Sequence, residues 1–276
     1  MLDHSTHELI QRALAEDIGP GDVTARLLPE SLSGTAELLA KSELVLAGGE
    51  VFAAVFRAVD PRIEVKLARP DGARVNNRQV IGQITGPARS ILTGERTALN
   101  FVQRLSGIAT FTARCVDAVV GTKAKIVDTR KTTPGLRVLE KHAVRMGGGY
   151  NHRFGLFDGI LIKDNHIAAL GGVAEAVRRA RGEAHHLLRV ECEVTSLEEL
   201  SEALAAGADV ILLDNMSTQM MREAVHRTAG RALLEASGNM TLGRLAEVAE
   251  TGVDLISMGA LTHTVSAADL SLEWIR

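Results

Sequence analysis

The stretch that decides the interpretation of this chain, residues 128–166, reads DTRKTTPGLRVLEKHAVRMGGGYNHRFGLFDGILIKDNH. One short apolar run, residues 124–127, ends directly before it, and a second, residues 159–162, lies near its end. Charged side chains follow each run at once. Arginine and lysine at the ends of buried strands are typical of an anion site, and so many cations indicate a ligand with several negative groups.

From Lys123 onward, short apolar runs alternate with segments of helical spacing. The predicted strands are residues 124–128, 159–162, 188–194, 210–213, 232–236 and 255–258, and helices are expected to begin near residues 136, 173, 196, 218 and 241. Continuous apolar runs are typical of parallel strands that are buried on both faces. Because a complete barrel has eight strand–helix units, this pattern predicts an α/β fold with an open, incomplete barrel of about six parallel strands.

The first hundred residues have a different pattern. Short strands are predicted at residues 38–41, 44–47, 63–67 and 80–85, with one helix at residues 50–59. Strands grouped around a single helix indicate a small mixed sheet in a separate domain. Two further helices, residues 90–106 and 110–119, are expected to connect this domain to the barrel.

The composition limits the kind of partner. The chain has 276 residues, 46% of them hydrophobic, and a net charge of -3, which excludes a global basic field for nucleic acid. Its two cysteines lack metal-binding spacing, so we expect both to be reduced core residues of a cytoplasmic protein. The polar N-terminal residues do not resemble a signal peptide, and no apolar run is long enough to cross a membrane.

Polar or small residues follow every predicted strand of the barrel. The carboxyl ends of parallel strands meet at one edge, where barrels and open sheets both place their ligands. The residues in question are cations after the first two strands, carboxylates at the next two and small residues after the last two: Arg130, Lys131, His152, Arg153 and Lys163; Glu193 and Asp214; Ser237, Gly238 and Gly259.

This order of side chains indicates a composite ligand. Glycine loops before helices are typical of phosphate sites, and guanidinium groups bind carboxylates through two hydrogen bonds. Glu193 and Asp214 would suit Mg²⁺ or the hydroxyl groups of a ribose. We therefore expect a phosphorylated sugar, with a metal ion, beside a carboxylated partner. Spacing alone does not distinguish Glu193 from Glu191, because both share a strand face, and Arg96 and Arg104 have the pattern of helix surface charges.

Long motifs in the chain resemble those of the quinolinate phosphoribosyltransferase family, and the resemblance covers nearly the whole sequence. The motifs are EDIGPGDVT at 16–24, ERTALNFVQRLSGIAT at 95–110, DTRKTTPGLR at 128–137, GGGYNHRFGLFDGILIKDNHI at 147–167, VECEV at 190–194, VILLDNM at 210–216, EASGNMTL at 235–242 and TGVDLISMGALTH at 251–263.

The resemblance implies a fold, an assembly and a reaction. It implies an N-terminal α/β sandwich domain, residues 1–108, to which a C-terminal segment, residues 266–276, returns, and a barrel domain, residues 109–265. It implies a homodimer or larger assembly, in which the sandwich of one subunit closes the barrel mouth of another. The implied reaction joins quinolinate to 5-phosphoribosyl-1-pyrophosphate, with Mg²⁺, and forms nicotinate mononucleotide, pyrophosphate and carbon dioxide.

The resemblance also implies roles for individual residues. Quinolinate would be bound by Arg130, His152, Arg153 and Lys163, with Arg96 from the neighbouring subunit. Lys131 would contact the pyrophosphate, Glu193 and Asp214 would hold the ribose hydroxyls and Mg²⁺, and Ser237, Gly238 and Gly259 would bind the 5-phosphate. Catalysis would rest on Lys131, Glu193 and Asp214, which stabilise charge as it develops.

Three other functions fit parts of the pattern. The sister pyrophosphorylase of molybdate-transport operons shares the DTRKT stretch, although the complete NHR and LIKDNH motifs favour quinolinate. A Schiff-base aldolase would use Lys163 as its amine nucleophile. A non-enzymatic sensor of phosphosugars or dicarboxylates would leave the Glu193 and Asp214 pair without a purpose.

Overall fold

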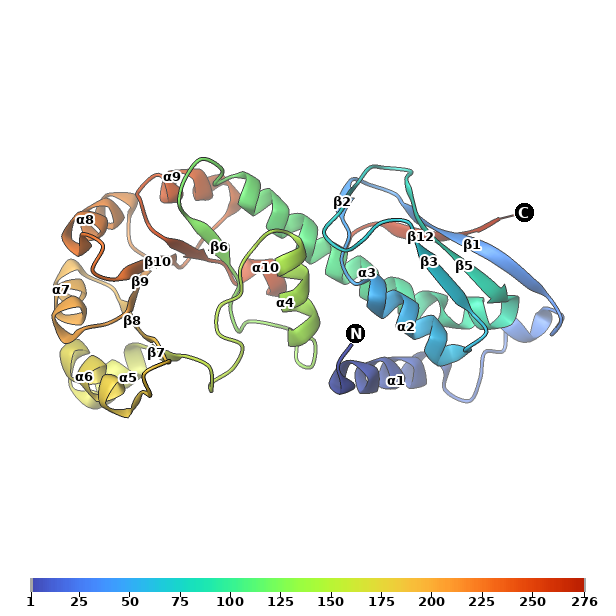
Figure 1. Cartoon of the computed structure of the whole chain (residues 1–276), viewed down its shortest axis with the longest axis horizontal. Coiled ribbons are helices and arrows are strands. Elements are labelled where there is room, and N and C mark those ends of the chain that lie inside the picture. Colours follow the sequence, from blue (N-terminus) through green and yellow to red (C-terminus); the bar gives the residue numbers. More distant parts are fainter. Residues whose placement is uncertain (1, 276) are drawn as a thin grey trace. The chain divides into compact units, whose positions relative to one another are not determined.

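The computed structural model describes residues 2–275, which form two compact units (Figure 1). Of the described residues, the first unit holds residues 2–113, the segment Thr133–Gly148 and residues 264–275. The second holds Arg114–Thr132 and Gly149–His263. The domain boundaries at residues 108 and 265 stay a prediction.

The first unit is built on an antiparallel four-stranded sheet. Its order is β12-β1-β5-β3, with β1 at Ser33–Ala40, β3 at Glu64–Leu67, β5 at Val80–Pro87 and β12 at Leu270–Ile275. A two-stranded pair, β2 (Leu44–Val45) and β4 (Arg74–Val75), lies apart from it. The strands predicted near β1, β2, β3 and β5 are present, whereas β4 and β12 were not predicted. Alternate residues of β1, Ala36, Leu38 and Ala40, are fully buried and contribute to the core.

Helices α1 (His4–Ile18), α2 (Gly49–Val59) and α4 (Arg137–Met146), with the short turn η1 (Ala25–Leu27), complete this unit together with the first part of α3. The prediction of two helices at 90–106 and 110–119 is wrong. A single helix, α3, runs from Ala88 to Asp117 over 30 residues. Gly107 does not end the helix. A Cβ at this position would collide with the carbonyl oxygen of Ser266, so the glycine allows close packing of two segments of the unit.

The second unit contains one parallel sheet, as the apolar runs predict. Its order is β6-β11-β10-β9-β8-β7. Among the described residues no pairing joins the edge strands β6 and β7, so the prediction of an open barrel of about six parallel strands is confirmed. The strands are β6 (Lys125–Val127), β7 (Ile160–Ile162), β8 (Val190–Val194), β9 (Val210–Asp214), β10 (Leu233–Ser237) and β11 (Leu255–Ser257).

Helices follow the strands and lie on the outer side of the sheet, as Figure 1 shows for α6 to α9. One short helix of this unit, α5, was not predicted. The bounds are α5 (Asp164–Leu170), α6 (Val173–Glu183), α7 (Leu197–Ala206), α8 (Thr218–Thr228), the turn η2 (Leu242–Arg244) with α9 (Leu245–Ala249), and α10 (Ala260–His263). Within residues 2–275, none of the helices combines the length and the apolar composition that a membrane span requires.

The two faces of the parallel sheet differ in chemistry, because successive side chains of a strand point to opposite faces. One face is apolar and nearly fully buried, and it forms the core with the helices: Cys192, Ile211, Leu213, Leu234, Ala236 and Ile256. The opposite face carries polar groups, among them Glu235, Ser237 and Ser257, which line a cavity. The inside of the open barrel is therefore available for a polar ligand.

Candidate functional site

A cavity of about 150 Å³ lies where the parallel strands of the second unit end. Its lining brings together predicted site residues that are far apart in the sequence: Arg130, Lys131, His152, Arg153, Lys163 and Ser237. Leu161 and Leu212 add an apolar surface between these polar groups. The cavity thus offers several cations and a flat apolar contact to one small ligand.

The end of β6 positions the residues that follow Tyr150. Asp128 is fully buried, and it accepts hydrogen bonds from Asn151 Nδ2 at 2.6 Å and from the backbone N–H of His152 at 2.8 Å. Asp158 accepts two backbone N–H groups of the next turn, those of Phe154 and Gly155. These carboxylates fix an irregular segment that has little regular secondary structure of its own.

Two arginines, Arg130 and Arg153, line this part of the cavity. Arg153 donates from Nη1 to the carbonyl oxygen of Gly159 at 3.0 Å, which fixes the direction of its side chain. Burial, and after it the positive charge of Arg130, lowers the pKa of the Arg153 guanidinium. Two like charges held so close favour an anion between them, and guanidinium groups bind carboxylates with good geometry.

The predicted carboxylates lie on neighbouring strands, β8 and β9. Glu193 Oε2 accepts from Lys163 Nζ at 2.8 Å, and Asp214 Oδ2 accepts from Asn215 Nδ2 at 2.8 Å. Within residues 2–275, the second oxygen of each carboxylate has no hydrogen-bond partner and could bind a ligand. Carboxylate oxygens are the donors that suit Mg²⁺, which retains water molecules and binds phosphate oxygens of substrates, but neither Glu193 nor Asp214 lines the described cavity.

The ion pair of Lys163 bears on the aldolase interpretation. A Schiff-base lysine reacts as the neutral amine. In this structure Glu193 lies 2.8 Å from Nζ of Lys163 and stabilises the charged ammonium. The geometry therefore supports a cation that binds an anionic ligand rather than an amine nucleophile.

The loops after β9 and β10 approach each other closely. Gly238 has a φ of 85°, and a Cβ there would collide with the side chain of Asn215. Asn239 Nδ2 donates to Asn215 Oδ1 at 3.0 Å, so an asparagine that the sequence analysis missed joins the two loops. A loop that requires glycine for both its φ and its packing leaves its backbone N–H groups close to any ligand.

Gly259, after β11, lies beside Lys131. A Cβ at Gly259 would lie 2.9 Å from Cδ of Lys131, and Thr262 Oγ1 donates to the carbonyl oxygen of Lys131 at 2.6 Å. The first and last strands of the unit thus position the same lysine. A side chain at this position would displace the stem of Lys131 or the ring of His263.

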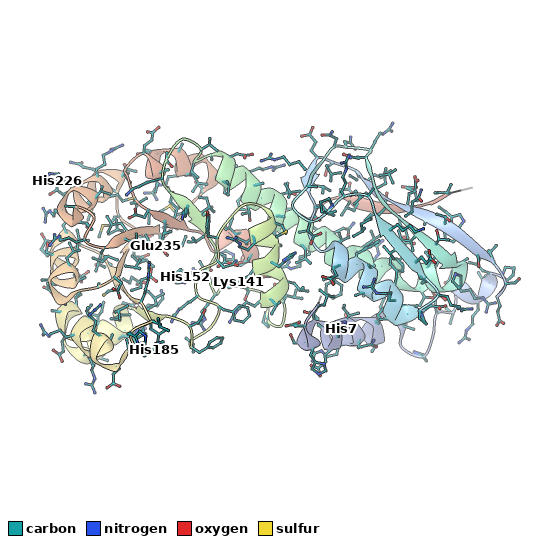
Figure 2. The ribbon with its side chains drawn as sticks, in the orientation of Figure 1. His7, Lys141, His152, His185, His226 and Glu235 are labelled. Atoms are coloured by element: carbon teal, nitrogen blue, oxygen red, sulfur yellow. The ribbon has the colours of Figure 1, made fainter. Side chains whose placement is uncertain are left out.

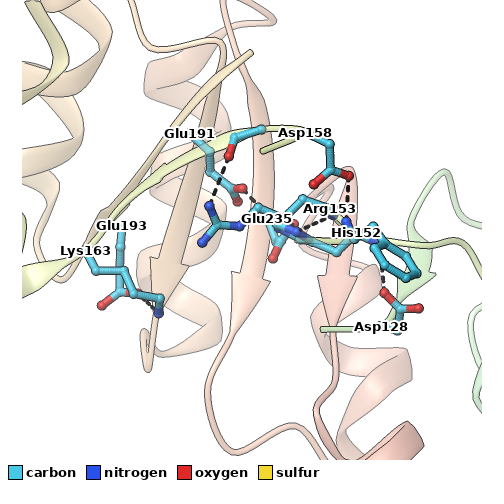
Figure 3. Close-up of polar contacts among 10 residues, drawn as sticks. Asp128, His152, Arg153, Asp158, Lys163, Glu191, Glu193 and Glu235 are labelled. Carbon is cyan, nitrogen blue, oxygen red and sulfur yellow. Dashed lines mark hydrogen bonds and ion pairs between the residues drawn. The ribbon is translucent and has the colours of Figure 1, made fainter. Parts of the chain in front are cut away.

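Sequence reasoning missed a buried cluster inside the barrel, formed by His152, Glu191 and Glu235 (Figure 3). His152 Nε2 lies 3.0 Å from Glu191 Oε2 and 3.7 Å from Glu235 Oε2. Burial, and after it the charge of Glu191, raises the pKa of Glu235 to about 7. Figure 2 shows His152 and Glu235 among the strands of the second unit, whereas His226 lies on the outer helix α8. A charged residue inside the apolar run LLEA is the signal that would have revealed Glu235.

The three ligand atoms of this cluster lie within 4.8 Å of one another, a spacing that would suit a metal ion. The hydrogen bonds of the His152 imidazole disfavour a metal ion at this place. His152 Nδ1 accepts from the backbone N–H of Arg153 at 2.8 Å, so in the neutral ring the proton is on Nε2, which faces the carboxylates. The nitrogen that faces the carboxylates therefore has no lone pair for a metal.

Arg96 is the predicted site residue that belongs to the first unit. It is exposed on α3 and lines a hollow of about 310 Å³ together with Asp17 and Asp22 of the EDIGPGDVT motif.

Arg104, on the same helix, is not the surface charge that the helical pattern predicted. Its Nε donates to Glu140 Oε1 at 3.0 Å, and Glu140 is fully buried, so Arg104 stabilises the first unit.

Comparisons with known proteins show the family of this chain. The family model for the N-terminal domain of quinolinate phosphoribosyl transferase matches residues 22–106, and the model for its C-terminal domain matches residues 108–273. The chain is 47% identical over 266 residues to the probable nicotinate-nucleotide pyrophosphorylase (carboxylating) of Bacillus subtilis, with 96% of this chain and 92% of the relative covered.

A second relative, the nicotinate-nucleotide pyrophosphorylase (carboxylating) of Mycobacterium leprae, is 46% identical over 276 residues, which cover 98% of this chain and 97% of the relative. Among solved structures, the nicotinate-nucleotide pyrophosphorylase of Francisella tularensis superimposes with a TM-score of 0.97 at 43% identity, covering 100% of this chain and 98% of that chain. By the matched domains, the identities and the shared fold, this chain belongs to the quinolinate phosphoribosyl transferase family.

Proposed function

We propose that this protein joins quinolinate to 5-phosphoribosyl-1-pyrophosphate and forms nicotinate mononucleotide, pyrophosphate and carbon dioxide, a step of NAD biosynthesis. The observation that carries this proposal is the cavity of the second unit, where Arg130, Arg153 and Lys163 surround a space of about 150 Å³. A small planar dicarboxylate offsets these charges and contacts the leucines between them. The names of the relatives describe the same carboxylating pyrophosphorylase chemistry.

Quinolinate has two carboxylates on adjacent ring carbons, and Arg130, Arg153 and Lys163 would bind them. In the described structure His152 donates from Nε2 to Glu191. A direct contact between His152 and a ligand carboxylate would therefore require the ring to leave this partner. The resemblance assigns His152 to quinolinate, and that role stays part of the proposal.

The second substrate would occupy the rest of the strand edge. Lys131 would contact the pyrophosphate, and Ser237, Gly238 and Gly259 would bind the 5-phosphate. Glu193 and Asp214 would hold the ribose hydroxyls and Mg²⁺, directly or through water. The ion would supply positive charge to the leaving pyrophosphate.

The reaction needs no nucleophilic side chain. As pyrophosphate leaves, positive charge develops on the ribose ring, and the Glu193 and Asp214 carboxylates stabilise it. Lys131 offsets the negative charge of the leaving group. The pyridine nitrogen of quinolinate then bonds to C1 of the ribose, and the resulting ring cation accepts the electron pair that remains when carbon dioxide departs. Orientation of two bound substrates lowers such a barrier by roughly 7–11 kcal/mol.

We propose a homodimer or larger assembly in which Arg96 completes the quinolinate site of a neighbouring subunit. The support is that the predicted site residues other than Arg96 belong to the second unit, whereas Arg96 is exposed on the first. A cytoplasmic location, expected from the cysteine usage, stays a prediction.

A binding experiment tests the division of the site. Titration calorimetry of Arg130→Ala should show quinolinate binding weakened by about 30-fold, because charge-assisted hydrogen bonds to a carboxylate contribute about 1.5–3 kcal/mol and the variant loses them. Binding of 5-phosphoribosyl-1-pyrophosphate should be largely intact. Arg189→Ala, which removes an arginine before β8 at the other end of the strands, is the matched control and should bind both ligands normally.

Equal weakening of both ligands by Arg130→Ala would contradict the assigned roles. A wild-type protein that binds nicotinate as tightly as quinolinate would contradict dicarboxylate specificity. Turnover of another pyridine or pyrimidine acid, without turnover of quinolinate, would favour the sister pyrophosphorylase instead.

A further inference from the structure

The inner face of the barrel separates two cavities, and Glu235 lies between them. On β10, Leu233, Glu235 and Ser237 share this face because they alternate along the strand. Leu233 lines a second cavity, of about 310 Å³, at the amino ends of the strands, and Ser237 lines the cavity at the carboxyl ends. Glu235 lines both.

The neighbouring strand β9 has the same order. Val210 lines the amino-end cavity, and Leu212 lines the carboxyl-end cavity. His152 and Arg153 contribute to both, as Glu235 does. The wall between the cavities is therefore made of ionisable groups, although apolar side chains would fill this space at a lower cost in free energy.

The surroundings of Glu235 favour the protonated form of its carboxyl group. Its side chain is 1% exposed, and among the described residues its Oε1 has no hydrogen-bond partner. The groups that act on it are Glu191 from β8, His152 from the segment after β6, Lys163 after β7 and Ser257 from β11. Arg153 lines the same cavity. Burial and the negative charge of Glu191 disfavour the charged form of Glu235 and raise its pKa, and the opposite effects of His152 and Lys163 are smaller.

The proposed reaction requires a proton at this place. When the C2–carboxylate bond of the pyridinium intermediate breaks, carbon dioxide departs and the electron pair stays on C2, beside the cationic ring nitrogen. A proton must then bond to C2. Arginine and lysine side chains in the same cavity are much weaker acids than a carboxylic acid.

We propose that Glu235 is the general acid that protonates C2 of the pyridine ring as carbon dioxide leaves. This inference rests on the proposed function. The O–H bond of Glu235 breaks, the C2–H bond forms with the electron pair left by carbon dioxide, and Glu235 becomes a carboxylate beside His152. It regains a proton from water through the amino-end cavity, while the nucleotide still occupies the carboxyl-end cavity.

Single-turnover experiments with Glu235→Gln separate the two chemical steps. Enzyme, quinolinate, 5-phosphoribosyl-1-pyrophosphate and Mg²⁺ are mixed, and the release of pyrophosphate and of carbon dioxide is followed separately. Pyrophosphate release should stay close to the wild-type rate. Carbon dioxide release should slow by about a hundredfold, the typical contribution of a general acid, and the dicarboxylated mononucleotide should accumulate. Glu250→Gln, an exposed glutamate of the same unit, is the control and should match the wild type.

The wild-type enzyme provides an independent measurement if Glu235→Gln fails to fold. Its carbon dioxide step should slow as the pH rises through about 7, because the protonated acid is lost, while the pyrophosphate step should not follow this titration. The inference is overturned by a carbon dioxide step independent of pH from 5.5 to 8.5, by unchanged carbon dioxide release in Glu235→Gln, or by equal slowing of both steps. Absence of pyrophosphate release from the wild type would instead overturn the proposed function.

Discussion

At the scale of single residues, a glutamate inside the barrel makes stability depend on pH. The pKa of Glu235 is raised to about 7 in the fold, whereas the unfolded chain has a glutamate pKa of about 4.3. The folded protein therefore binds more protons between these values. The contribution of the protonated group to stability is complete below about pH 4 and is lost as the pH rises through about 7.

Urea denaturation of the wild type and of Glu235→Gln at pH 6, 7 and 8 tests this sign. The free energy of unfolding of the wild type should fall, relative to the variant, as the pH increases, because the amide of glutamine does not titrate. Groups that do not interact with residue 235 cancel in the difference. A difference that is constant with pH, or that grows in favour of the wild type, would contradict the raised pKa.

The sequence predicted one part of the site and missed another for physical reasons. Cations that follow apolar runs, such as Arg130 and Lys163, were identified because parallel strands bring their carboxyl ends to one edge. Glu235 lies within an apolar run, and strand spacing did not distinguish Glu191 from Glu193. Their role depends on which inner-face side chains meet across the barrel, and strand spacing does not specify these contacts.

At the scale of elements, the parallel strands were predicted within a few residues because each is a continuous apolar run. Strand β12 has no such run, and it forms only by pairing with β1, more than two hundred residues earlier in the chain. The prediction that two helices meet near Gly107 was wrong, because α3 continues through this residue. Glycine lowers helix propensity, but here the absence of a side chain permits a tertiary contact that outweighs this cost.

Gly107→Ala tests this explanation of α3. The added methyl group would meet the carbonyl oxygen of Ser266, and we expect it to lower the free energy of unfolding by about 1–3 kcal/mol, as overpacked substitutions do. Gly182→Ala in α6 is the matched control. It has no heavy atom within 4 Å of the new Cβ, so its helix should be unchanged or stabilised by up to about 1 kcal/mol. If Gly107→Ala had the same free energy of unfolding as Gly182→Ala, the explanation by close packing of Gly107 against Ser266 would be contradicted.

At the scale of the whole molecule, the proposed contribution of Arg96 to a neighbouring subunit predicts complementation. Arg96→Ala and Arg130→Ala should each be inactive alone. In a heterodimer one site would lack both arginines and the other would have both. The two variants are unfolded, mixed in equal amounts and refolded together, so that subunits pair at random. About a quarter of the wild-type activity should return, because half of the dimers are mixed and half of the sites in a mixed dimer are complete. If Arg96 served its own subunit, mixing would restore no activity.

The open barrel and the family were accessible from the sequence because both depend on features that extend over long stretches: the number of strand–helix units and the long motifs. The assembly was not accessible in the same way, because a surface arginine such as Arg96 has the same pattern whether or not another subunit covers it. Only the resemblance gave Arg96 a role.

Product analysis tests the central claim most directly. The purified protein is incubated with quinolinate, 5-phosphoribosyl-1-pyrophosphate and Mg²⁺, and the nucleotide, pyrophosphate and carbon dioxide are quantified together by mass spectrometry and coupled assays. We predict nicotinate mononucleotide in equal amounts with pyrophosphate and carbon dioxide. No nucleotide from quinolinate, or a nucleotide formed only when nicotinate replaces it, would contradict the proposed function.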